Sequence, residues 1–406
     1  MPLNLAAVVP QLRALSDALA EPLPDDAGAL AEALAALNAW SACLEEIWLA
    51  IGNSHASWLC AEPAEPLATV HPLPECPADL MVLGSDGGQI EPDPHAPLLF
   101  YVLNVGLAAI GYGREPEAVL RSETHLAHRE DEILTPVNGQ RLLVAGDVLA
   151  VRRGARELRG LAALARAQRD RGRWPLVALR DGNLIEWSLQ WSLEGGEDPA
   201  TRAELYRPFE EALDDLRQIG VPVASYVSRP RSTYLVNTLR VVLCDRPLDD
   251  CRRLCNTARL DRDPAAPACS RLRGLTDRQL FEALPLPAGA RSASFRRAGK
   301  GAWGQVEPAA SVRFCYVNTG AEIARIELPD WVAEDPSALD LVHAAVVDQC
   351  RRGDGYPPVL TEAHEQAVVL HHDREALDQL LAAELARLGL TPRPSEKATS
   401  KRRRAL

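Results

Sequence analysis

The sequence predicts an α/β protein in which helices cover a β-sheet. Its 406 residues are 47% hydrophobic and 25% charged, a composition that can bury a substantial core. From residue 81 onward, short apolar runs of strand length alternate with longer segments of helical periodicity. This alternation is typical of layered α/β architectures, in which helices pack on the faces of a sheet.

The first 62 residues predict a helical appendage to the main domain. Leu and Ala recur at three- and four-residue spacing through residues 12–19 and again through 30–37, as on one face of a helix. This face either packs against the main domain or forms a surface for a dimer or another partner. A proline-rich link at 63–77 separates the appendage from a main domain expected at 78–390.

The elements of the main domain follow from apolar periodicity and turn residues. The stretch 97–111 is interrupted by Asn104 and Gly106 and is too short to span a bilayer, so it predicts two buried strands. A polar stretch with His125 and His128 follows. We expect strands at 81–84, 98–104, 107–112, 176–179, 221–227, 312–317 and 322–328, and helices at 147–169, 203–219, 337–351, 358–372 and 373–388.

Charge and cysteine content limit the class of protein. The 44 basic and 56 acidic residues give a net charge of −12, so any contact with nucleic acid requires a local basic patch. The N-terminus lacks the pattern of a signal peptide. The nine cysteines are odd in number and fit free thiols in a reducing compartment. We therefore expect a cytoplasmic protein with no membrane partner.

Two aspartates follow apolar runs and precede glycine. Asp86 comes before Gly87 and Gly88, and Asp181 comes before Gly182. Carboxylates at the ends of neighbouring strands are a common way to build a divalent-metal site. The alternative is turn chemistry, because Asp-Gly pairs also favour tight turns.

Five segments in order resemble the NurA nucleases, over about residues 82–385. They are residues 86–95 (DGGQIEPDPH), 180–184 (RDGNL), 226–232 (YVSRPRS), 325–329 (RIELP) and 356–364 (YPPVLTEAH). The chain departs from the family pattern in having Gly88 where a serine is usual and Arg229 where many members have lysine.

The resemblance implies both a fold and an activity. The fold is a ribonuclease-H-like mixed sheet flanked by helices. The activity is that of a metal-dependent DNA nuclease, with single-strand endonuclease and 5′–3′ exonuclease action on single strands and duplex ends. The resemblance also implies a homodimer that works with HerA, a hexameric ATPase. The chain has no Walker loop of its own. A catalytically weak or inactive adaptor that docks such an ATPase onto DNA is the alternative, and two intact aspartates favour the nuclease.

The resemblance assigns five active-site residues. Asp86, Asp181 and Glu157 would hold Mn²⁺ or Mg²⁺, since hard cations prefer carboxylate oxygens. Tyr356 and His364 would complete the site, because an imidazole can orient water and a phenol can donate to a phosphate oxygen. Glu157 lies in an arginine-rich segment, so a helical ion pair is the alternative reading for it. Glu327 is a reserve candidate, as a further acid or as the partner of Arg325.

Four arginines are candidate DNA contacts. Arg229 and Arg231 flank Pro230 after a predicted strand, where their guanidinium groups could reach a phosphate or could lie in a solvated turn. Arg296 and Arg297 add a basic segment suited to single-stranded backbone.

The segment 244–275 is predicted to be an insertion rich in cysteine and arginine. Its four thiols could hold zinc, but no C-x₂-C spacing is present, so we expect no tightly bound metal there. The basic tail at 391–406 lacks an apolar face and is expected to be disordered. The four thiols are Cys244, Cys251, Cys255 and Cys269.

Overall fold

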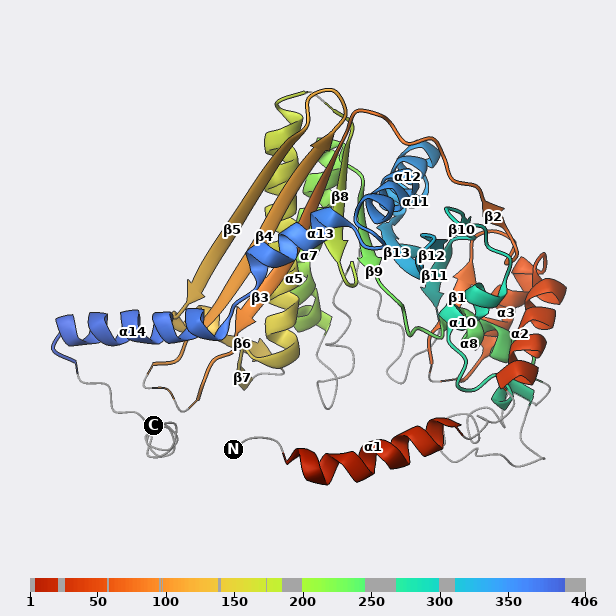
Figure 1. The fold of residues 1–406 in the computed structure, drawn as a ribbon, viewed down its shortest axis with the longest axis horizontal. Coiled ribbons are helices and arrows are strands. Elements are labelled where there is room, and N and C mark those ends of the chain that lie inside the picture. Colours follow the sequence, from red (N-terminus) through yellow and green to blue (C-terminus); the bar gives the residue numbers. More distant parts are fainter. Residues whose placement is uncertain are drawn as a thin grey trace. The chain divides into compact units, whose positions relative to one another are not determined.

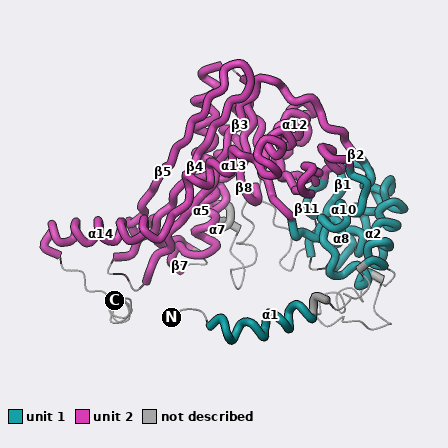
Figure 2. The backbone as a smooth tube through the Cα atoms, in the orientation of Figure 1, with its two compact units in different colours: residues 1–69, 230–286, 295–304 teal, residues 70–229, 287–294, 305–406 magenta. Residues whose placement is uncertain are grey.

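The computed structural model divides the chain into two compact units (Figure 2). Unit 1 contains residues 1–69, 230–286 and 295–304, and unit 2 contains residues 70–229, 287–294 and 305–406. Within these units the structure describes residues 4–20, 26–56, 58–94, 96, 98–137, 140–172, 174–184, 199–244, 268–298 and 311–390.

Unit 2 is built on a mixed sheet with the strand order β12-β13-β9-β8-β3-β4-β5. Strands β3 (Leu80–Ile90), β4 (Tyr101–Tyr112) and β5 (Glu117–Ala127) are antiparallel neighbours, whereas β3 is parallel to β8 (Leu176–Asp181) and β8 to β9 (Val223–Val227). Strands β13 (Ile323–Pro329) and β12 (Val312–Asn318) extend the sheet antiparallel to β9, and the short β10 (Arg291–Ser292) pairs with β12 and with β2 (Val70–His71). This is a mixed sheet of the kind that the resemblance implies, and the predicted α/β fold class is confirmed.

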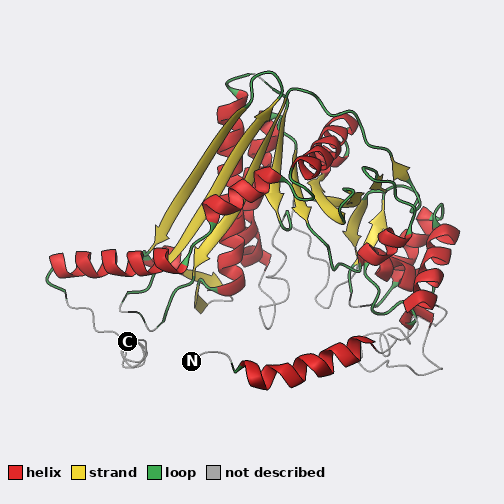
Figure 3. Ribbon diagram, in the orientation of Figure 1, coloured by secondary structure: helices red, strands yellow, loops and turns green. Residues whose placement is uncertain are grey.

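Helices cover both faces of this sheet (Figures 1 and 3). On one face, α5 (Gly146–Arg169) and α7 (Pro199–Ile219) form the crossovers between parallel strands and enclose a core that includes Leu83, Leu158 and Phe209. On the other face, α12 (Pro336–Arg352) and α13 (Pro358–Ala367) bury a second core with Val82 and Val359. The shorter elements of unit 2 are α4 (Glu130–Ile133), β6 (Leu134–Val137), β7 (Gln140–Leu143) and α11 (Asp330–Ala333), and α14 (His371–Arg387) follows α13.

The β4–β5 region differs from the sequence prediction in two ways. Residues 101–112 form one strand and not two, because Asn104 and Gly106 both pair within the ladder to β5. The polar stretch that follows forms β5, an exposed strand whose side chains are mostly polar. A strand with an exposed face carries few apolar residues, so its sequence resembles a loop.

Unit 1 joins the N-terminal segment to the middle of the chain. Helices α2 (Asp26–Trp40) and α3 (Leu44–Asn53) contact α8 (Tyr234–Val242), and β1 (Cys60–Pro63) pairs with β11 (Phe295–Ala298). The remaining elements are η1 (Ala268–Ser270) and α10 (Asp277–Ala283). The compact units therefore do not follow the predicted boundary at residue 62. Helix α1 (Leu5–Ala20) exposes Leu5, Leu12 and Leu15.

Two further predictions concern the insertion and the chain as a whole. Cys244 and Cys269 are free thiols, whereas Cys251, Cys255 and the tail at 391–406 lie outside the described residues. In the described ranges no single helix is long and apolar enough to cross a membrane, and the segments Ala27–Trp40 and Leu44–Asn53 meet that criterion only as a pair bent by 117°.

Candidate functional site

Asp86 and Asp181 lie side by side on the parallel strands β3 and β8. Ser85 pairs with Arg180 in the register of these strands, so the residue after each lies at the same level of the sheet. Asp181 ends β8, and Gly182 follows with a φ of 77°, a value that favours glycine. Asp86 lies inside β3, which continues to Ile90, so the turn predicted after it is absent.

His364 and Tyr356 each bind one of the two aspartates. His364 Nδ1 lies 2.7 Å from Asp86 Oδ2, and the Tyr356 hydroxyl donates to Asp181 Oδ1 over 2.8 Å. Burial raises the pKa of Asp181, and the Asp86 carboxylate adds to this, while the Tyr356 hydrogen bond opposes it. Burial and the Asp181 charge also raise the pKa of Tyr356, so the phenol stays protonated as a donor. Four of the five predicted active-site residues therefore meet here.

Glycines let α13 pack directly on the backbone of the sheet. Gly84 and Gly88 on β3 and Gly106 on β4 face this helix. A Cβ added at Gly106 would lie only 1.9 Å from the carbonyl oxygen of Ala363. The absence of side chains at these positions brings the helix close enough for His364 to reach β3. Gly88 thus has a packing role where the family pattern has serine.

Asn104 fixes the end of α13. Its side-chain Nδ2 donates to the carbonyl oxygens of Gln366 and Ala367 at 3.0 Å each, satisfying carbonyls that a helix end leaves free. Its Oδ1 accepts hydrogen bonds from Ser122 and Thr124 at 2.9 and 2.7 Å. The sequence pattern predicts a strand break at Asn104, although an amide inside an apolar run is itself a signal for a buried polar contact.

Gly106→Ala is expected to destabilise unit 2 by about 1–3 kcal/mol, because the added methyl group meets helix backbone that cannot move aside without displacing α13. Denaturant unfolding measures this. Gly52→Ala is the control, since Gly52 lies in α3 and a Cβ added there would have no atom within 4 Å, and this variant should unfold at or above the wild-type midpoint. Equal midpoints for Gly106→Ala and wild type would contradict the close packing.

Glu157 lies on the other face of the sheet, on α5. Its carboxylate is buried and forms ion pairs with Arg180 at 2.8 Å and with Arg153 at 3.2 Å. A Cβ at Gly87 would be 2.2 Å from Glu157 Oε1, so this glycine gives the carboxylate its space. Both carboxylate oxygens thus face guanidinium groups. The pair with Arg153 is the helical ion pair that the sequence offers as the alternative to metal binding.

The donor set fits a divalent cation in part. Asp86 and Asp181 offer two carboxylates, and the charge of Asp86 contributes to the raised pKa of Asp181. Glu157 does not join them as it is placed, and across the described ranges no three His, Cys, Asp or Glu side chains form a group that could hold a metal ion. The two aspartates are therefore the residues here that suit a metal.

A buried polar network holds the turn after Asp181. Arg325 pairs with Glu327 at 3.0 Å and donates to Asn183 Oδ1 at 2.9 Å. Glu327 also accepts from the backbone N–H of Leu184, and Arg180 donates to the carbonyl of Asn183. Glu327 is therefore the salt-bridge partner of Arg325 and not a further acid beside the two aspartates. Together with Arg325 it holds the turn that follows Asp181.

The four predicted DNA-contacting arginines are divided between the units. Arg229 is exposed after β9 in unit 2, with a φ of 42° that is uncommon for a residue other than glycine. Arg231, Arg296 and Arg297 belong to unit 1. Arg297 lies over the ring of Tyr234, with 5.8 Å from its Cζ to the ring centroid.

The model of the NurA domain family matches residues 81–369. Three solved structures are similar to the chain at low identity. The NurA nuclease from Sulfolobus solfataricus is 13% identical with a TM-score of 0.43, covering 78% of this chain and 88% of that chain. NurA with manganese is 10% identical with a TM-score of 0.39, covering 77% and 91%. The catalytic domain of human endonuclease V is 14% identical with a TM-score of 0.30, covering 74% and 84%.

No curated protein matches the sequence significantly. The family match covers residues 81–369 of 406, which is well over half of the chain and includes both aspartates, Tyr356 and His364. The chain belongs to the NurA domain family of nucleases.

Proposed function

We propose that this protein is a metal-dependent DNA nuclease whose centre is the pair Asp86 and Asp181. The observation that carries the proposal is the meeting of these two carboxylates with His364 and Tyr356 from a separate segment of the chain. Asp86 and Asp181 would hold Mn²⁺ or Mg²⁺, which when bound supplies charge neutralisation at a phosphodiester and activation of water.

The protein's own side chains perform the remaining tasks. His364 has Nδ1 fixed by Asp86, which leaves Nε2 free to orient or accept a proton from an attacking water. Tyr356 keeps its proton and can donate to a carboxylate or to a phosphate oxygen. Arg229 is exposed in the same unit and offers a guanidinium group for a neighbouring phosphate of the strand.

The finer activity rests on resemblance to the family. We propose single-strand endonuclease and 5′–3′ exonuclease action on DNA ends, as a cytoplasmic homodimer that works with a HerA-like ATPase. The net charge of −12 supports the need for a partner, because nonspecific DNA affinity requires a dense cationic face. The exposed leucines of α1 are a candidate contact for such assembly. Since α2 and α3 pack in unit 1, the test is deletion of residues 1–20 and not of the whole predicted appendage, followed by light scattering.

The direct test is cleavage of end-labelled single-stranded DNA by the purified protein with Mn²⁺, with Mg²⁺ and with EDTA. Cleavage is expected with at least one of the two cations and none with EDTA, because two carboxylates repel a phosphodiester anion unless a bound cation neutralises the charge. Equal cleavage in EDTA would contradict metal dependence, and no cleavage under any condition, with or without a HerA-like ATPase, would contradict the nuclease assignment.

The alternative is a catalytically weak or inactive adaptor that docks a partner ATPase onto DNA. One observation favours it: Glu157, the third predicted metal ligand, is held by Arg153 and Arg180. For nuclease activity, either Glu157 must break its ion pairs with these arginines to reach a metal ion, or Asp86 and Asp181 must suffice to bind it. DNA binding and ATPase stimulation without any cleavage would support the adaptor.

A further inference from the structure

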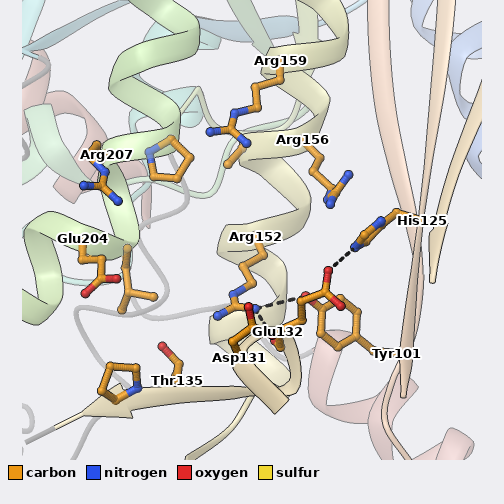
Figure 4. Close-up of a pocket in the computed structure, with 14 residues that line it drawn as sticks. Tyr101, His125, Asp131, Glu132, Thr135, Arg152, Arg156, Arg159, Glu204 and Arg207 are labelled. Carbon is orange, nitrogen blue, oxygen red and sulfur yellow. Dashed lines mark hydrogen bonds and ion pairs between the residues drawn. The ribbon is translucent and has the colours of Figure 1, made fainter. Parts of the chain in front are cut away.

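A pocket of about 280 Å³ lies on the α5 and α7 side of the unit 2 sheet (Figure 4). Arg152, Arg156 and Arg159 line it from α5, and His125 lines it from β5. The side chains of β4 that face this pocket alternate with those that face α13. The pocket is therefore on the opposite face of the sheet from His364 and is separate from the proposed nuclease centre.

The three α5 arginines project from one face of the helix, as their spacing of four and three residues requires (Figure 4). Arg152 donates to the Tyr101 hydroxyl at 3.1 Å and to a backbone carbonyl, both uncharged acceptors. Arg159 pairs with Glu211 at 3.0 Å. Arg156 is half-buried, and in the part of the chain that the structure describes it has no hydrogen bond or ion pair.

The acids in the pocket wall either have partners other than Arg156 or are exposed. Glu132 accepts from the backbone N–H of Arg129 at 3.2 Å and lies 3.3 Å from His125 Nε2. Asp131 pairs with Arg129 at 3.5 Å, and Glu204 is exposed at the rim. None of these carboxylates forms an ion pair with the central guanidinium group among the described residues.

Positive charge is crowded at the centre of the pocket. Burial lowers the pKa of Arg156, and the charges of Arg159 and Arg152 add to this effect, while Tyr101 and the charge of Glu132 oppose it. Burial and the charge of Arg156 likewise lower the pKa of His125 against the opposing effect of Glu132, and the net shift favours the neutral imidazole. A half-buried cation is costly without an ion pair or hydrogen bond, so an anion bound directly to Arg156 would relieve this cost.

We propose that this pocket binds a phosphate group, with Arg156 as its principal ligand and Arg152 and Arg159 on either side. The planar guanidinium fork matches two oxygens of a phosphate, and a helix that presents several such forks holds the group in a defined place. A volume of about 280 Å³ is at the low end for ligand pockets and suits a phosphate with a small substituent. The group could belong to the end of a DNA strand or be free in solution.

The first test is thermal unfolding of the full chain with inorganic phosphate against chloride at equal ionic strength, in EDTA. Phosphate is expected to raise the melting temperature of the wild type by about 2 °C or more in a saturable way. Arg156→Gln should lose this rise, and Arg156→Lys should retain part of it with affinity at least about tenfold weaker, because lysine keeps the charge but not the fork.

Arg166→Gln is the matched control, because Arg166 is an exposed arginine on the same helix whose partner is Asp215 and it does not line the pocket. It should keep the full phosphate response. The proposal is overturned if phosphate does not stabilise the wild type, if Arg156→Gln responds like the wild type, or if Arg166→Gln loses as much as Arg156→Gln. None of these readouts depends on nuclease activity, so the proposal stands or falls apart from the proposed function.

The second test distinguishes the source of the phosphate. Fluorescence anisotropy in EDTA compares an oligonucleotide that carries a 5′-phosphate with the same oligonucleotide ending in a 5′-hydroxyl. Tighter binding of the phosphorylated strand, abolished in Arg156→Gln and kept in Arg166→Gln, assigns the pocket to a strand end. Equal binding of both strands, with the Arg156-dependent response to inorganic phosphate intact, assigns it to free phosphate.

Discussion

Asp181→Asn and Asp86→Asn are each expected to lower metal-dependent DNA cleavage by at least about 100-fold. Removing a group that only orients a metal ligand lowers metal affinity or activity by up to about 100-fold, and we expect a larger loss when the carboxylate ligand itself is removed. The fold should persist, because Asn is nearly isosteric and can still accept the Tyr356 hydrogen bond. Burial and Asp86 already disfavour the Asp181 anion, so Asp181→Asn should be at least as stable as the wild type.

Cleavage rates of labelled single-stranded DNA and melting temperatures, measured on the same preparations, check this result. Asp340→Asn is the matched control, because Asp340 is an exposed carboxylate on α12 in the same unit. It should keep wild-type activity. If either active-site variant cleaves DNA at the wild-type rate, the aspartate that it replaces has no role in the reaction. A rise in melting temperature on adding Mn²⁺, seen for the wild type and lost in both variants, would give evidence of binding independent of activity.

His364→Ala is expected to reduce the cleavage rate by about 10²–10⁴-fold, the usual contribution of a positioned acid–base group. Its effect on stability should be small, since the side chain is 59% exposed and contributes little to the packing of α13 against the sheet. The expected signature is thus a large loss of activity at an unchanged melting temperature.

His371→Ala provides the comparison for this variant, because His371 is an exposed histidine at the start of α14 that pairs only weakly with Glu375 at 3.5 Å. Its activity should match the wild type. If activity in His364→Ala falls only as far as its melting temperature does, His364 is structural. A double variant with Asp86→Asn should lose little more than the worse single variant, because residues that act together are not additive.

The crossover helices and central strands were predictable from local sequence. The strands at β8, β9, β12 and β13 are short apolar runs bounded by turn residues, and α5 and α7 show sustained helical periodicity. The exposed strand β5 was not predictable, because most of it is solvated and its continuous polar run, residues 121–125, resembles a loop. The division into units was also hidden, since it depends on contacts between α2, α3 and the distant α8.

The sequence by itself determined the fold class and the membership of Asp86, Asp181, Tyr356 and His364 in one site, because their segments keep the order and residue types of a family. Tertiary structure decided how they meet: glycines at 84, 88 and 106 bring α13 onto the sheet, and Asn104 fixes its end. It also decided that Glu157 is paired with two arginines on the opposite face and that Arg156 lacks a partner among the described residues. Local periodicity shows which residues share a face of a strand or helix, but it does not show which distant segment packs against that face, and these pairings depend on such contacts.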